Sequence, residues 1–67
     1  MKVKELFEAE SVDNEFIERK FDGPYWESCS AFVSTNWDRE IETLSEKQAS
    51  WLTKILDDCV EKRIEDK

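Results

Sequence analysis

Apolar residues recur at steps of three and four over the last third of the chain, which is the spacing of one face of a helix. After Glu46 neither proline nor glycine interrupts this pattern. Just before it, Ser45 and Gln48 have the spacing of a capping box, in which each side chain accepts a hydrogen bond from the other residue's backbone N–H. The pattern therefore predicts a helix from Glu46 to about Ile64. Its stripe consists of Ala49, Leu52, Leu56, Cys59 and Arg63, flanked by Ile55 and Val60.

A second helical stripe precedes the first. Gly23 and Pro24 interrupt the chain ahead of it, and we expect Gly23 to end a preceding helix in the left-handed conformation and Pro24 to fit the first turn of the next. This second helix is predicted over about 24–41. Residues 42–44 then form a short link, which predicts that the two long helices make an antiparallel hairpin. The stripe consists of Trp26, Cys29, Val33, Trp37 and Ile41.

The N-terminal segment has a weaker pattern. Residues 2–10 are compatible with a short helix carrying Val3, Leu6 and Phe7, and Asp13 can cap a second short helix. A β-hairpin through Asp13 and Asn14 is the alternative, but its flanks do not alternate and its turn lacks glycine. The second short helix would carry Phe16, Ile17 and Phe21.

The predicted fold class is all-α, with residues 1–67 forming one small domain. The helical hairpin, about 24–41 and 46–64, would pack against a helical N-terminal segment as a bundle of three or four helices. A chain of 67 residues needs large side chains to build a stable core, and it has eight aromatic residues. We expect the centre of the core to be Trp26, Val33, Trp37, Leu52, Leu56 and Cys59.

The chain has two cysteines and no histidine, so neither a zinc site nor a histidine base is predicted. Cys29 and Cys59 fall on the two stripes, and we expect buried free thiols, with a disulfide as the alternative. Carboxylate pairs such as Asp57 and Glu61 fall on a predicted solvent face, where nothing would raise their pKa. We therefore expect no catalytic residues, metal or cofactor.

The formal net charge is −7, and residues 5–38 hold nine acidic and two basic residues. Negative charge disfavours direct nucleic-acid binding and binding to anionic membranes, whereas it suits a basic protein partner. No run approaches the ~18 apolar residues of a membrane span. We expect a cytoplasmic protein.

Two features are candidates for binding a partner. Trp51 lies off the centre of its stripe, beside Lys47 and Lys54, and is either an interface anchor or part of the core beneath the N-terminal segment. The acidic run 5–18, which includes Glu8, Glu10 and Glu15, is either a solvated face or a mimic of nucleic-acid phosphate that docks on a basic cleft.

The segment 32–55 contains Leu-Ser-Glu-Lys-Gln, a following Trp and Lys54-Ile55. It resembles the closing helical hairpin of assorted small bacteriophage proteins and of some phage recombination enzymes. It is also similar to the small companion proteins of T-even phage recombination helicases. The resemblance implies a compact helical domain that acts beside nucleic-acid processing, although the charge of −7 departs from a DNA-binding surface.

Together these features predict a non-enzymatic, acidic protein-binding module. It would be a phage-encoded adaptor or inhibitor of a nucleic-acid-processing or defence protein, acting in one version by nucleic-acid mimicry. The alternative is an accessory protein of a recombination helicase that binds single-stranded DNA weakly, with Trp51 as a stacking platform beside Lys47 and Lys54. Pairing of two hairpins into a homodimer is a further expectation.

Overall fold

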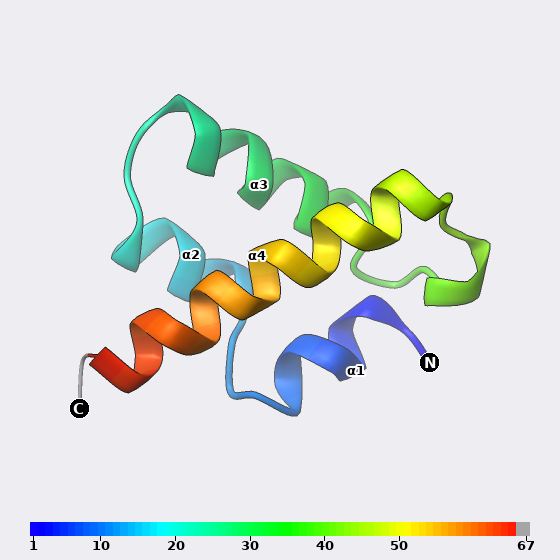
Figure 1. Cartoon of the computed structure of the whole chain (residues 1–67), viewed down its shortest axis with the longest axis horizontal. Coiled ribbons are helices and arrows are strands. Elements are labelled where there is room, and N and C mark those ends of the chain that lie inside the picture. The colour runs from blue at the N-terminus through cyan, green and yellow to red at the C-terminus, as the bar shows by residue number, and fades with distance from the viewer. Residues whose placement is uncertain (66–67) are drawn as a thin grey trace.

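The computed structural model describes residues 1–65 and confirms the all-α prediction (Figure 1). Within that range the chain forms no strand, and its one β-type contact is an isolated bridge between Lys2 and Glu40. No helix among these residues has the length and apolar character needed to cross a bilayer. The elements are α1 (Val3–Glu8), α2 (Asn14–Lys20), α3 (Pro24–Thr35), the 3₁₀ helix η1 (Ile41–Thr43) and α4 (Glu46–Glu65).

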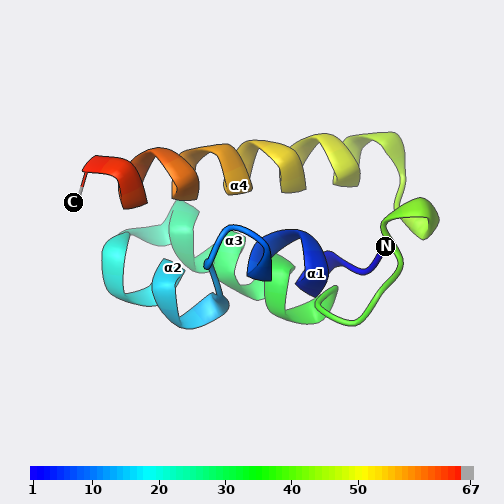
Figure 2. The ribbon, with the colours of Figure 1, turned by 90° about the horizontal axis from the view of Figure 1, so that it is seen from below.

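The helices form two layers. Helix α4 makes one layer by itself, and α1, α2 and α3 lie side by side in the other (Figure 2). The Cα positions extend over 17 Å along the shortest axis, which fits two layers of helices packed about 8–10 Å apart. Helices α3 and α4 run in opposite general directions, and α4 passes across the other layer (Figure 1).

Helix α4 begins as the sequence predicts. The backbone N–H of Ser45 donates to the Gln48 side chain at 3.0 Å, and the N–H of Gln48 donates to the Ser45 hydroxyl at 3.2 Å. This reciprocal pair is the predicted capping box. The start of α2 is also confirmed, because the Asp13 carboxylate accepts the backbone N–H of Phe16 at 2.8 Å. The alternative β-hairpin through Asp13 does not form.

Helix α3 is shorter than predicted, since it ends at Thr35 rather than at about Ile41. The buried Asn36 side chain donates to the carbonyl of Phe32 at 2.8 Å, and its own carbonyl oxygen accepts from Arg39 at 3.1 Å. An asparagine that bonds to the helix backbone in this way favours a terminus over continuation. The connection to α4 is consequently residues 36–45, longer than the predicted link of 42–44.

Gly23 has a different role from the predicted one. Helix α2 ends at Lys20 and Phe21 is extended, so Gly23 does not end that helix. Gly23 instead occupies the N-cap position of α3, with φ 106° and ψ 165°, and Pro24 begins the helix as predicted. The correction arises because two non-helical residues, Phe21 and Asp22, separate α2 from the glycine.

Helix α1 is held at its start by the connection that follows α3. The backbone N–H of Val3 donates to the Arg39 carbonyl at 2.9 Å, and that of Lys4 donates to the Trp37 carbonyl at 3.0 Å. The N–H of Ile41 in turn donates to the Met1 carbonyl at 2.8 Å. Backbone groups that a helix start normally leaves unpaired are thus satisfied by a distant segment.

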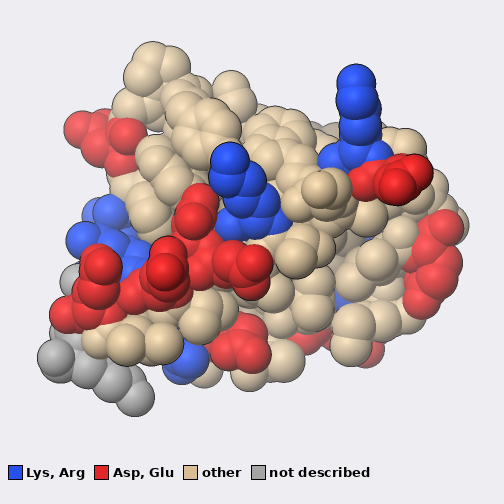
Figure 3. All heavy atoms as spheres, in the orientation of Figure 1, with Lys and Arg blue, Asp and Glu red and all other residues tan. Residues whose placement is uncertain are grey.

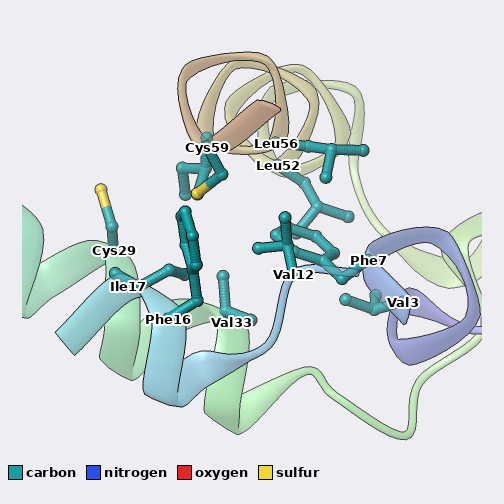
Figure 4. Packing of buried hydrophobic residues seen from close by; sticks show 11 residues of the cluster. Val3, Phe7, Val12, Phe16, Ile17, Cys29, Val33, Leu52, Leu56 and Cys59 are labelled. Carbon is teal, nitrogen blue, oxygen red and sulfur yellow. The ribbon is translucent and has the colours of Figure 1, made fainter. Parts of the chain in front are cut away.

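The core lies between the two layers (Figure 4). Cys29 and Cys59 are both fully buried free thiols, as predicted. Trp26 and Trp37 were expected at the centre but are only partly buried at its margin, because side chains of α1 and α2 fill the space between α3 and α4. The buried apolar side chains are Val3, Phe7, Val12, Phe16, Ile17, Cys29, Val33, Leu52, Ile55, Leu56 and Cys59.

Candidate functional site

Trp51 is half-buried on α4, and its ring stacks on that of Phe32 from α3. The ring centroids are 4.3 Å apart and the planes are inclined by 29°. The sequence suggested that the N-terminal segment would be the cover if Trp51 were part of the core. The ring that packs on it comes from α3 instead, and Trp51 keeps part of its surface exposed.

Cys29, also on α3, is fully buried. Burial raises the pKa of the Cys29 thiol, and hydrogen bonding from the Tyr25 and Trp51 side chains offsets part of that rise. The Trp51 ring is held in place by its stack on Phe32. Tyr25, whose ring meets that of Trp26 edge-on with centroids 5.2 Å apart, remains 47% exposed. We refer to Tyr25, Phe32 and Trp51 together as the aromatic surface.

The two predicted lysines border the aromatic surface. Lys47 precedes Trp51 by four residues and Lys54 follows it by three, so both lie on the Trp51 side of α4, and both are exposed. Figure 3 shows uncharged atoms gathered over α3 and the first half of α4, with basic side chains projecting among them. The structure thus brings together Trp51, Lys47 and Lys54.

The three predicted acidic residues lie elsewhere. Glu8 ends α1 and Glu15 is in the first turn of α2, both exposed, so they belong to the layer opposite α4. Glu10 follows α1 and is half-buried, with its carboxylate 3.6 Å from the Arg63 guanidinium. Glu10 is therefore already engaged in an ion pair within the chain.

Helix α4 also carries an acidic region, of which only Asp57 and Glu61 were considered from the sequence, as a solvent-facing pair and not as a binding candidate. Acidic side chains gather over the second half of this helix (Figure 3), where it carries Asp57, Asp58, Glu61 and Glu65. Their spacing of three and four residues was visible in the sequence as a solvent-facing pattern. The aromatic surface and this acidic region therefore occupy successive halves of one helix.

Sequence reasoning also missed a groove between α2 and α3. It encloses about 510 Å³, and one of its walls is formed by Phe21 and Trp26, whose rings stack with centroids 3.8 Å apart and planes inclined by 22°. The sequence signal was the turn at Asp22 and Gly23, which folds these two aromatic residues against each other. Acidic and polar side chains complete the lining: Asn14, Glu18, Asp22, Glu27, Ser30 and Ser34.

Within residues 1–65, no three His, Cys, Asp or Glu side chains are arranged to hold a metal ion. The chain matches no protein-family model, no curated protein and no solved structure. The aromatic surface, the acidic region and the groove are accordingly the features from which a function can be argued.

Proposed function

We propose that the chain is a non-enzymatic, acidic protein-binding module, an adaptor or inhibitor that docks on a basic protein through its aromatic surface. The observation that carries this proposal is the Trp51–Phe32 stack, in which a large ring is fixed in place and still partly exposed. Tryptophan and tyrosine are enriched among the residues that dominate binding energy at protein interfaces.

Because the Trp51 ring is fixed in position, we interpret it as part of an interface and not as a core residue that the chain leaves partly uncovered. A side chain already held by Phe32 loses little conformational freedom when a partner covers its exposed part. Contacts made by the ring therefore contribute to the binding free energy without a large loss of side-chain entropy. The exposed Tyr25 adds a second amphipathic ring of the kind found at interfaces.

The net charge of −7 supports a basic partner, because complementary charge raises the rate of encounter. A cytoplasmic protein that handles nucleic acid, or a defence protein with a basic cleft, has the required surface. Nucleic-acid mimicry is the more specific version of this proposal. The exposed Glu8 and Glu15 of the run 5–18 support it, whereas Glu10 already pairs with Arg63 of α4.

Substituting Trp51 tests the proposal. The wild-type chain, immobilised, is used to capture proteins from a host lysate, and each captured protein is then measured for binding kinetics. For a partner held by the aromatic surface, Trp51→Ala should speed dissociation and cost above roughly 2 kcal/mol of binding free energy. Glu8→Gln with Glu15→Gln should mainly slow association, since exposed charges act through steering.

Ile64→Ala provides the control, because Ile64 is 61% exposed on the same helix and lies 13 positions beyond Trp51. Trp51→Phe should retain part of the affinity by keeping an aromatic ring against Phe32. The circular dichroism of each variant establishes that it is folded. A partner bound equally well by wild type and by folded Trp51→Ala contradicts the proposal. Sedimentation at micromolar concentration distinguishes the 8.0 kDa chain from a homodimer that covers the same surface.

A second candidate function follows from the positions of Lys47 and Lys54. Basic side chains on both sides of an aromatic ring suit weak binding of single-stranded DNA, in which a base stacks on the ring, as in an accessory protein of a recombination helicase. Binding of oligo-thymidine that weakens steeply with salt and is lost in Trp51→Ala would favour this function. If the chain captures a protein and has no affinity for the oligonucleotide, the protein-binding function is favoured.

A further inference from the structure

We propose that the groove between α2 and α3 is a binding site for an arginine side chain presented by a basic peptide segment. The groove lies on the α2 side of α3, whereas Phe32 of the aromatic surface faces Trp51 of α4. Its volume of about 510 Å³ is within the 300–1,000 Å³ range of ligand pockets. The proposed occupant is thus distinct from whatever covers Trp51.

The stacked rings of Phe21 and Trp26 provide the first half of the recognition. They form an aromatic wall, and Trp26 is only partly buried. A guanidinium is planar and weakly hydrated, so it packs favourably against an aromatic surface. An aliphatic ligand would gain the same apolar contact without the attraction between the cation and the ring.

Carboxylates without an ion-pair partner in the described part of the chain provide the second half of the recognition, and one of them, Asp22, accepts the backbone N–H of Gly23 at 2.9 Å. Glu18, Asp22 and Glu27 line the groove, no lysine or arginine does, and among residues 1–65 none of these three carboxylates makes an ion pair. The local charge is therefore negative and not neutralised from within. Carboxylates beside an aromatic wall match the fork of donors that a guanidinium carries.

Ser30 adds a neutral acceptor. It is 9% exposed and lines the groove, and its hydroxyl donates to the Asn14 side-chain oxygen at 2.9 Å. Because that bond uses the hydroxyl hydrogen, the oxygen can still accept from a ligand. With donors on all three of its nitrogens, arginine can use the carboxylates and this oxygen together, whereas the compact ammonium of lysine matches fewer of them.

Nuclear magnetic resonance of the ¹⁵N-labelled chain tests the inference. The probe is a capped hexapeptide of alternating arginine and glycine, compared with the same peptide carrying lysine or citrulline in place of arginine. We expect saturable shifts of the Trp26 indole N–H, assigned by its absence from Trp26→Phe, and affinity about threefold or more higher for the arginine peptide than for the lysine peptide. The uncharged citrulline peptide should give no saturable shift.

Two double variants separate the groove from the general charge of the protein. Glu18→Gln with Glu27→Gln should weaken the arginine peptide about fivefold or more, because both carboxylates line the site. The matched control, Glu61→Gln with Glu65→Gln, removes the same charge from exposed positions on α4 and should change affinity less than about twofold. All four residues are exposed, so both variants are expected to fold.

Equal weakening by the two double variants, or shifts confined to the Trp51 indole, overturns the inference. So does the absence of any saturable shift at low salt. The inference shares with the proposed function only the expectation of a basic partner. The two fail separately, because the peptide titration needs neither a captured protein nor Trp51, and the kinetic comparison of Trp51→Ala with wild type changes only the aromatic surface.

Discussion

Gly23 occupies a backbone conformation, φ 106° and ψ 165°, that belongs almost entirely to glycine. A Cβ built at this position meets no atom within 4 Å, so a side chain would be opposed by the backbone alone. We expect Gly23→Ala to lower the free energy of unfolding by about 1–3 kcal/mol, measured by urea denaturation. Gly23 also lines the groove, and strain there should reduce affinity for the arginine peptide.

A D-alanine at position 23 is the matched control for this prediction. For a D-residue the same dihedral angles correspond to the ordinary extended region, so the methyl group is added without backbone strain. A chain of 67 residues is accessible to chemical synthesis. If the L- and D-alanine proteins were equally destabilised, backbone strain would not be the cause.

The two buried thiols make stability depend on pH in the alkaline range. Burial is the main cause that raises the pKa of Cys59 to about 12 from an ordinary value of 9.0, and the charge of Asp58 adds to it. The unfolded chain therefore loses this proton at a lower pH than the folded chain does. The contribution of Cys59 is fully present below about pH 9 and is lost progressively as the pH rises toward 12.

Urea denaturation at a series of pH values from 7 to 10.5 measures this effect, with Cys59→Ala as the comparison. The slope of stability against pH above 9 should be shallower in Cys59→Ala. In the same range a thiol reagent should modify the unfolded chain rapidly and the folded chain slowly. Rapid modification of both thiols in the folded chain at pH 8 contradicts the assignment.

Among the elements, α4 has the greatest influence on stability, because it alone covers the layer of α1, α2 and α3. Leu56→Ala should destabilise the chain by about 2–5 kcal/mol, since Leu56 is 8% exposed and its loss leaves a cavity between the layers. Thermal and urea unfolding measure this value. Ile64→Ala, at an exposed position of the same helix, should change stability by less than about 0.5 kcal/mol.

The elements that local chemistry specifies were predictable from the sequence. The caps at Asp13 and Ser45, the proline at the start of α3 and the uninterrupted stripe of α4 all have the expected roles. The end of α3 was not predictable, because the apolar spacing of Trp37 and Ile41 continues past the point where Asn36 ends the helix. The buried side chain of Asn36 is a tertiary feature that periodicity does not reveal.

The candidate sites, too, were predictable only as far as local sequence specifies them. The off-centre position of Trp51 left two alternatives open, an interface anchor or a core residue beneath the N-terminal segment. Its half-buried position against Phe32 depends on how α3 and α4 are placed against each other. The groove could not be predicted without the conformation of the turn between α2 and α3, because that turn brings Phe21 onto Trp26. In sequence its carboxylates were indistinguishable from other solvated acids.

For the whole molecule, α3 is the element shared by both proposed binding surfaces. It contributes Tyr25 and Phe32 to the aromatic surface, and Trp26 and Ser30 to the groove. A partner that placed a basic segment in the groove and an apolar patch on Trp51 would engage both at once. Linked contacts of this kind raise overall affinity beyond that of either site, so each can be weak alone.

The bonds that tie α1 to residues 37–41 also bear on the order in which the chain folds. A helix of six residues is not stable by itself, and the carbonyl groups that cap α1 come from Trp37 and Arg39. At ribosomal rates of ~5–20 residues per second, those carbonyls are added about 2–7 s after Val3. Until they arrive, Val3 and Phe7 have neither caps nor a core to enter. Helix α1 is consequently expected to become stable only after residues 37–39, which cap it, have been made.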